Sequence, residues 1–244
     1  MRENPKLDKN GQRRGGKRKG AGRPKKGVRS SEPHKIREAF KPNQPVHVTL
    51  RVAPDVASLR VSVLYFALHA ALVTTYATDR IRIVHISIQG THIHLFVEAN
   101  NRTALARGMQ GFEIAAARHI NAAVTRLTGV KRRGTVFPDR YHAVIIRSPR
   151  QARNELAYVV NNWRRHGETK SLVVGDGRID LFSSAPSFDG FEDVDVRSAE
   201  WPKTYMPLPV WTPRTWLLST GWRRHGLVRS TEVPGPSRAA RARR

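Results

Sequence analysis

The sequence predicts a mixed α+β fold. Between residues 46 and 99, three short stretches alternate apolar and polar side chains, which is the two-residue period of a β-strand. Three longer stretches, near 54–78, 100–128 and 149–166, carry apolar side chains at the spacing of a helix. Because the two periods follow one another along the chain, strands and helices are expected in one folded region.

The first two expected elements are a strand and a long helix. Residues 46–52 (VHVTLRV) alternate and are rich in β-branched side chains, which favours a strand. Pro54-Asp55 then opens an apolar-rich stretch that runs to about Thr78. The residues at helical spacing in this stretch are Leu59, Val63, Phe66 and Ala70. We therefore expect a helix that begins soon after Pro54 and ends near Thr78.

A hairpin and a second long helix follow. Residues 82–88 and 92–99 both alternate, and Gly90-Thr91 between them is typical of a tight turn, so the two runs predict paired strands. Residues 100–128 are Ala-rich and amphipathic and end at Gly129, as expected of a helix. The candidates for its N-cap are Asn101 and Thr103.

One more strand and one more helix complete the expected core. Residues 141–147 favour a strand. Ser148-Pro149 supplies an N-cap and a first-turn proline, and Gly167 supplies a stop, so a helix is expected over about 149–166. The order is β-α-β-β-α-β-α. Its first six elements are those of a ferredoxin-like antiparallel sheet, to which a C-terminal helix is added.

The composition points to nucleic acid as the partner. The chain has 44 Lys and Arg against 19 Asp and Glu, a formal charge of +25. It has no cysteine, which excludes disulfides and cysteine-ligated zinc. No secretory signal and no apolar run long enough for a bilayer are visible, so we expect a cytoplasmic protein with no membrane partner.

Charge and composition divide the chain into four expected parts. Residues 1–44 form a basic arm, expected to be disordered, in which Gly22-Arg23-Pro24 resembles an AT-hook core; a generic polybasic tail is the alternative. Residues 45–167 form the predicted domain. Residues 168–233 read as an acidic loop, which could mask a basic groove, followed by a short helix from Thr212 to near Gly226. Residues 234–244 are a second basic tail.

Two local motifs carry candidate chemistry. In His92-Ile93-His94 the two imidazoles point to the same face of a strand, which supplies half of a divalent metal site. Tyr158 and Asn162 are four residues apart and share one face of the last predicted helix. A phenol can attack phosphorus, and an amide oxygen can complete the coordination of a metal. The alternatives are ordinary histidines, a core tyrosine and an asparagine at a helix end.

Three stretches of the predicted domain carry a family resemblance. They read GTHIHLFV at 90–97, GTVFPDRY at 134–141 and YVVNN at 158–162. Together they resemble the single-tyrosine HUH transposases, most closely the REP-associated tyrosine transposase branch, and the resemblance covers about 45–167. The chain departs from the family pattern at Gly90-Thr91, where Pro-Asn is usual, and at Trp163, where Pro is usual. Neither departure removes the histidines or the tyrosine.

The resemblance implies a metal-dependent DNA transposase. Such an enzyme cleaves and rejoins single-stranded DNA, often beside a hairpin, through a 5′-phosphotyrosine intermediate. Tyr158 would be the catalytic nucleophile, and His92, His94 and Asn162 would hold Mg²⁺ or Mn²⁺. The resemblance also implies a bacterial, nucleoid-associated protein in the cytoplasm. Relatives occur as monomers and as homodimers, so the oligomeric state stays open.

Cations and one aromatic ring near this region are the candidate DNA contacts. Besides Arg23 they are Lys131, Arg132, Arg133, Arg140, Trp163, Arg164 and Arg165. Arg140 could instead form a structural ion pair, and Trp163 could pack its helix onto the sheet. The motif Trp-Arg-Arg-His-Gly at 163–167 recurs at 222–226, where helix-end chemistry is the alternative to a DNA patch. Two further classes remain open: a domesticated, catalytically silent DNA-binding protein, and an RNA-binding protein built on the same sheet.

Overall fold

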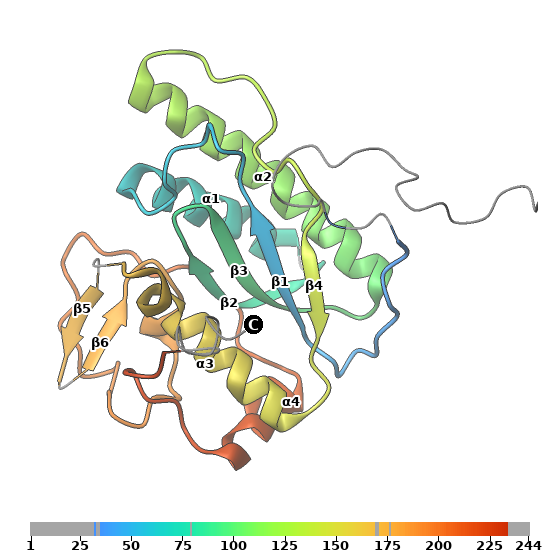
Figure 1. Ribbon diagram of the computed structural model, residues 1–244, viewed down its shortest axis with the longest axis vertical. Coiled ribbons are helices and arrows are strands. Elements are labelled where there is room, and N and C mark those ends of the chain that lie inside the picture. Colours follow the sequence, from blue (N-terminus) through green and yellow to red (C-terminus); the bar gives the residue numbers. More distant parts are fainter. Residues whose placement is uncertain (1–31, 33–34, 79, 169–170, 176, 234–244) are drawn as a thin grey trace, which may run out of the picture. The chain divides into compact units, whose positions relative to one another are not determined.

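In the computed structural model, four strands form a central antiparallel sheet (Figure 1). The strands are β1 (Val46–Arg51), β2 (Arg82–Ile88), β3 (His92–Glu98) and β4 (His142–Ile145), hydrogen-bonded in the order β2-β3-β1-β4. Together with the β-α-β-β-α-β order along the chain, this is the ferredoxin-like arrangement. The predicted α+β fold is confirmed.

The structure describes residues 32, 35–78, 80–168, 171–175 and 177–233. The chain divides into two units, 1–33 and 34–244, and only Glu32 of the first unit is described. The predicted basic arm with Arg23 falls outside the described residues, apart from Glu32 and the segment from Lys35 onward. The predicted tail at 234–244 also falls outside them.

Two helices pack on one face of the sheet. They are α1 (Ser62–Thr78) and α2 (Arg102–Thr128), and they share a core with the inward side chains of the strands. Asn101 caps α2 by accepting a hydrogen bond from the backbone N–H of Ala104 at 2.9 Å, which decides between the two N-cap candidates. Gly129 ends α2 with a φ of 71°, a left-handed conformation that glycine adopts without strain.

The alternation of β1 and β3 decides which side chains face α1 and α2. In β1, Val46, Val48 and Leu50 lie in that core, as do the odd-numbered residues Ile93, Leu95 and Val97 of β3. The intervening side chains must therefore point to the opposite face of the sheet. Those side chains are His47, Thr49 and Arg51 on β1, and His92, His94 and Phe96 on β3.

The helix α3 (Pro149–His166) covers this second face. It begins and ends as the sequence predicts, with Ser148 accepting from the backbone N–H of Gln151 and Gly167 in a left-handed conformation. Its buried side chains, Leu156 and Val160 among them, join Phe96 of the sheet in a second core. Because α3 carries the candidate tyrosine, this core holds that residue against the histidine face of the sheet.

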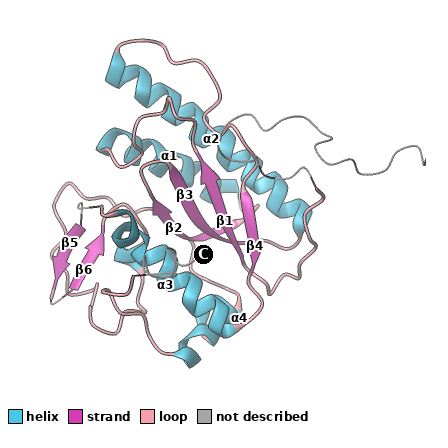
Figure 2. Cartoon of the chain, in the orientation of Figure 1, coloured by secondary structure: helices cyan, strands magenta, loops and turns pink. Residues whose placement is uncertain are grey.

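Residues 171–233 form an extension that is more ordered than the sequence indicates. A hairpin of β5 (Ser171–Val174) and β6 (Gly177–Asp180) replaces the start of the expected loop, as Figure 2 shows beside α3. The expected helix at 212–226 is instead α4 (Trp216–Ser219) and the 3₁₀ turn η2 (Gly221–His225); another such turn, η1, spans Ala185–Ser187. The extension contributes Phe188, Leu218 and Trp222 to the second core, so α3 is packed between the sheet and the extension.

The first predicted helix begins later than expected. Residues 52–61 form turns whose backbone is bonded to other segments: Val52 N–H donates to Thr91 O at 3.1 Å, and Leu59 N–H donates to Gly90 O at 3.0 Å. These groups are therefore not available for helical bonds. The buried face also differs from the predicted one, because Leu64 and Leu68 are buried whereas Phe66 is 45% exposed.

Several acidic residues of the extension form ion pairs and hydrogen bonds with other residues of the extension. Asp189 pairs with Arg223 and Glu192 with Arg229, both at 2.8 Å. The carboxylate of Asp193 accepts from the backbone N–H of Ser230 at 2.8 Å. These contacts favour a role in the fold of the extension over the masking of a basic groove.

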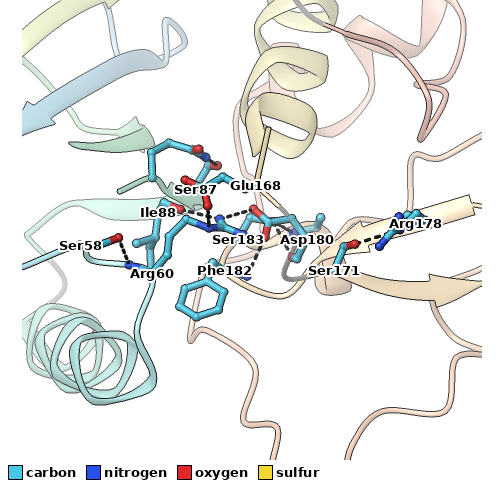
Figure 3. Close-up of polar contacts among 12 residues, drawn as sticks. Ser58, Arg60, Ser87, Ile88, Glu168, Ser171, Arg178, Asp180, Phe182 and Ser183 are labelled. Atoms are coloured by element: carbon cyan, nitrogen blue, oxygen red, sulfur yellow. Dashed lines mark hydrogen bonds and ion pairs between the residues drawn. The ribbon is translucent and has the colours of Figure 1, made fainter. Parts of the chain in front are cut away.

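A buried ion pair connects the extension to the main sheet (Figure 3). Arg60, in the turns before α1, donates to both carboxylate oxygens of Asp180 on β6, at 2.7 and 3.1 Å, and to the backbone oxygen of Ile88 at 2.8 Å. Its Nε lies 3.2 Å from a carboxylate oxygen of Glu168, just after α3. One guanidinium thus connects the start of α1 and the end of β2 to the end of α3 and to β6.

Within the described ranges, no helix is long and apolar enough to cross a membrane.

Candidate active site

The two histidines of the His-x-His motif lie on the face of the sheet that α3 covers. His94 is 4% exposed and His92 is half-buried, and their ring centroids are 4.8 Å apart. They share this face because residues two apart on a strand point the same way, as the sequence predicts. The face therefore carries two imidazoles next to each other, and one of them is almost fully enclosed.

α3 places two polar side chains against these rings, at positions 158 and 166. The ring of Tyr158 lies 5.1 Å from that of His94, and the ring of His166 lies 5.1 Å from that of His92. Asn162 lies one helical turn from each of these contacts and is fully buried. The structure thus brings the predicted tyrosine to His94, one of the two predicted histidines, with the predicted asparagine on the same helix face.

Three atoms in this region are buried and have no hydrogen-bond partner among the described residues. They are Nε2 of His94 and both polar atoms of the Asn162 side chain. Leaving such an atom unpaired costs about 1–3 kcal/mol, so buried polar atoms are usually satisfied by protein, water or a ligand. An imidazole nitrogen and an amide oxygen are both ligands for a divalent cation, so the residues present fit such an ion.

The electrostatics of the site keep His94 neutral. Burial lowers the pKa of His94 well below its ordinary value of 6.5, and the neighbouring His47, His92, His166 and Arg51 lower it further. Burial also lowers the pKa of His166, where Arg165 and Arg60 act in the same direction and Glu168 opposes them. A metal-binding histidine must be neutral, so this environment suits His94 for coordination.

No cluster of three or more His, Cys, Asp or Glu side chains suited to a metal occurs in the part of the chain that the structure describes. A metal site among these residues would therefore need at least one ligand of another kind, such as an amide or backbone oxygen or water.

Two residues of this region, His47 on β1 and Glu155 on α3, were not predicted from the sequence. His47 on β1 is buried, and its Nε2 lies 3.0 Å from Nδ1 of His94. Its other ring nitrogen lies 2.7 Å from Glu155 on α3. The alternation of residues 46–52 does place His47 on the polar face of its strand, but the neighbour of His47 depends on the pairing of β1 with β3. In that pairing Thr49 lies opposite His94, and His47 lies diagonally from it.

The candidate DNA contacts in the loop after α2 differ in their exposure and in the contacts that their side chains make within the protein. Lys131 and Arg133 are exposed. The guanidinium of Arg132 instead pairs with Asp55 at 2.8 Å and donates to Asn121, so it fastens the loop. Arg140 donates to the backbone oxygen of Lys35 at 3.3 Å. Exposure thus favours Lys131 and Arg133 over Arg132 as phosphate contacts.

The aromatic candidate and its neighbouring arginine at the end of α3 take part in packing. Trp163 is 4% exposed, and the guanidinium of Arg164 covers its ring at 4.4 Å. Arg164 also donates to the backbone oxygen of Ser230 at 2.6 Å, and Arg165 is half-buried. The repeated motif forms the same pair, since Trp222 is buried beneath Arg223 at 4.7 Å. This arrangement favours packing over base stacking for both copies of the motif.

Comparisons with known proteins identify one family. Residues 45–162 match the family model of IS200-like transposases. Among solved structures, the chain is similar to a REP-associated tyrosine transposase bound to a REP hairpin, with 17% identity, a TM-score of 0.47, and coverage of 75% of this chain and 93% of that one. It is also similar to a protein of Deinococcus radiodurans R1 described as a candidate transposase, with 12% identity, a TM-score of 0.36, and coverage of 57% and 98%. No curated protein matches the chain.

Proposed function

Because residues 45–162 belong to the IS200-like transposase family, we propose that this protein is a DNA transposase that cleaves and rejoins single-stranded, hairpin-bearing DNA through a phosphotyrosine on Tyr158. The observation that carries the proposal is the contact of Tyr158 with His94, whose buried Nε2 has no hydrogen-bond partner among the described residues. A tyrosine with only a packing role would not require such a neighbour.

A divalent cation is part of the proposal. His92, His94 and Asn162 would hold Mg²⁺ or Mn²⁺, since two imidazole nitrogens and an amide oxygen leave coordination positions open for phosphate oxygens. When bound, such a cation polarises the scissile phosphate as a Lewis acid.

The proposed reaction is a phosphoryl transfer to the side chain of Tyr158. The phenolic oxygen attacks the phosphorus and loses its proton, while the bond from phosphorus to the 3′ oxygen breaks and that oxygen takes up a proton. The products are a 5′-phosphotyrosine and a free 3′-OH. One phosphodiester replaces another, so a second 3′-OH can reverse the step and join a new strand without ATP. The packing of α3 against Phe96 of the sheet would orient the phenol for this attack.

One chain supplies all the proposed catalytic and ligand groups. The histidines lie on β3, and Tyr158 and Asn162 lie on the α3 of the same chain. The extension packs against α3 and shares the second core with it. The proposed chemistry therefore needs no second copy of the protein, and homodimerisation stays a separate prediction.

The proposal is tested by trapping the covalent intermediate. We expect a labelled single-stranded hairpin oligonucleotide and Mn²⁺ to give a protein–DNA adduct that survives denaturation, with the DNA on the peptide that contains Tyr158. Mass spectrometry of the digested adduct checks the site, and EDTA should prevent the adduct. Tight binding of the oligonucleotide with no adduct would contradict the proposal and support the alternative of a catalytically silent DNA-binding protein.

We also propose that the N-terminal arm contributes to DNA affinity. Nine Lys and Arg lie between residues 13 and 29, with Arg23 among them. Each phosphate contact adds about 0.7 to the slope of log affinity against log salt for single strands. Deleting residues 1–31 should therefore weaken binding and flatten this slope by several units, as measured by fluorescence anisotropy at several salt concentrations.

The deletion should stop before residue 35 because the following residues contact the domain. Arg37 donates to the backbone oxygen of Tyr141 at 2.8 Å, and Glu38 pairs with Arg147. The exposed Lys131 and Arg133 provide a comparison, since replacing both with Ala should lower the slope by no more than about 1.4. An unchanged slope after the deletion would show that the arm does not contact DNA.

A further inference from the structure

A chain of hydrogen bonds leads from α3 to His94. Oε2 of Glu155 lies 2.7 Å from Nδ1 of His47, and Nε2 of His47 lies 3.0 Å from Nδ1 of His94. Glu155 is three residues before Tyr158 on the same helix, and His47 is 7% exposed. A carboxylate on the tyrosine helix is thus connected to a candidate metal ligand on β3 through a buried imidazole on β1.

The hydrogens of this chain can be assigned from its chemistry. A carboxylate can only accept a hydrogen bond, so the hydrogen between Glu155 and His47 belongs to Nδ1 of His47. A second hydrogen lies between His47 and His94. If it belonged to His47, Nδ1 of His94 would be the acceptor and the ring hydrogen of His94 would lie on Nε2, where the described part of the chain offers no acceptor.

An unpaired buried donor is costly, so the hydrogen of His94 belongs on Nδ1. Nε2 of His47 then accepts it at 3.0 Å, and Oγ1 of Thr49, which lies 3.2 Å from Nδ1 of His94, is a second acceptor. This assignment leaves Nε2 of His94 with a free lone pair, which is what coordination to a cation requires.

We propose that Glu155 and His47 are positioning residues that fix the tautomer and the ring orientation of His94, so that its Nε2 presents a lone pair to the divalent cation. The inference rests on the proposed function, which supplies the cation. Metal-binding histidines commonly donate their other ring N–H to an acceptor, and loss of that acceptor lowers metal affinity by about 10–100-fold. Here the acceptor is itself a histidine, held in turn by a carboxylate.

The first test measures the affinity for Mn²⁺ in the full-length protein. Titration followed by the electron paramagnetic resonance of free Mn²⁺ should show that His47→Phe and Glu155→Leu each raise the Kd by about 10–100-fold. His47→Gln keeps an amide oxygen that can accept from Nδ1 of His94, and Glu155→Gln keeps an acceptor for His47. Both should therefore bind Mn²⁺ more tightly than the apolar variants.

A second readout needs no metal. The ¹⁵N chemical shifts of the His94 ring in metal-free protein show which nitrogen carries the hydrogen. We expect the hydrogen on Nδ1 in the wild type and a shift of the population toward Nε2 in His47→Phe. A wild-type ring with its hydrogen on Nε2 would overturn the proposal whatever the variants do.

Glu232→Gln is the matched control for a purely structural role. Glu232 accepts a hydrogen bond from Arg153 on α3 at 2.6 Å, so this variant loosens the same helix two residues before Glu155 without touching the histidines. It should leave Mn²⁺ affinity and the His94 tautomer unchanged, and thermal unfolding should show all variants folded. If Glu232→Gln weakens Mn²⁺ binding as much as Glu155→Leu does, Glu155 only docks the helix and the proposal fails.

The two proposals fail in different ways. Wild-type protein that binds no Mn²⁺ and forms no DNA adduct overturns the proposed function, and this inference with it, before any variant is made. Wild-type protein that binds Mn²⁺, with His47→Phe and Glu155→Leu variants of equal affinity, overturns this inference alone.

Discussion

Replacing Tyr158 with phenylalanine should reduce formation of the protein–DNA adduct by at least about 10⁴-fold, because the substitution removes the only atom that forms the new bond to phosphorus. The ring itself should remain in place. It packs against His94 at 5.1 Å and His47 at 5.8 Å, and phenylalanine preserves both contacts. Quantitative gel analysis of the adduct at fixed Mn²⁺ and hairpin DNA measures the effect.

Binding and stability separate this loss from a general defect. Tyr158→Phe should keep the wild-type affinity for hairpin DNA and for Mn²⁺, since it changes neither a proposed ligand nor a surface cation. Its free energy of unfolding should change by less than about 1 kcal/mol, as the ring stays partly buried in the second core.

Tyr141→Phe is the matched control. Tyr141 also belongs to a motif shared with the family, but it lies in the first core, on the other face of the sheet, beneath the guanidinium of Arg37 at 3.6 Å. It should form the adduct at close to the wild-type rate. If Tyr158→Phe retained the adduct and Tyr141→Phe lost it, the assignment of the nucleophile would be wrong.

Local periodicity was enough to predict which candidate side chains share a face of a strand or a helix, whereas their roles came from the family resemblance. The two-residue period of a strand places His92 and His94 on one face, and the helical period places Tyr158 and Asn162 on another. The caps were equally local signals, since α3 begins after Ser148 and ends before Gly167, as predicted. The ferredoxin-like order then brings α3 onto the face of the sheet opposite the two preceding helices, where the two motifs meet.

Features that depend on contacts between distant segments could not be predicted in this way. The link between His47 and His94 depends on the register of β1 against β3, which no local pattern specifies. The late start of α1 depends on backbone bonds to the β2–β3 turn, and the exposure of Phe66 on how α1 lies against α2. The hairpin of β5 and β6 is short, and no local pattern distinguishes Asp180 from the other acids of the expected loop, because its partner Arg60 lies 120 residues away in the sequence.

That partner makes Asp180→Ala the substitution with the largest expected effect on stability. Asp180 is fully buried, and Arg60 is 3% exposed. Removing the carboxylate takes the buried anionic partner away from a buried guanidinium, which should cost about 3–5 kcal/mol of unfolding free energy. Urea unfolding followed by circular dichroism measures the loss.

An exposed ion pair of the extension provides the comparison for Asp180→Ala. The N–O distance between Arg223 and Asp189 is 2.8 Å, close to the 2.7 Å between Arg60 and Asp180, but both side chains are at least a third exposed. Asp189→Ala should therefore cost no more than about 1 kcal/mol of unfolding free energy.

The double variant Arg60→Leu with Asp180→Leu removes both charges and should recover much of the stability lost in Asp180→Ala, because no charge remains buried and unpaired. Equal losses for Asp180→Ala and Asp189→Ala would show that the buried pair does not hold the extension to the sheet. Since the extension packs α3 from the side opposite the sheet, a real loss at Asp180 should also slow adduct formation at Tyr158, even under conditions where the protein remains folded.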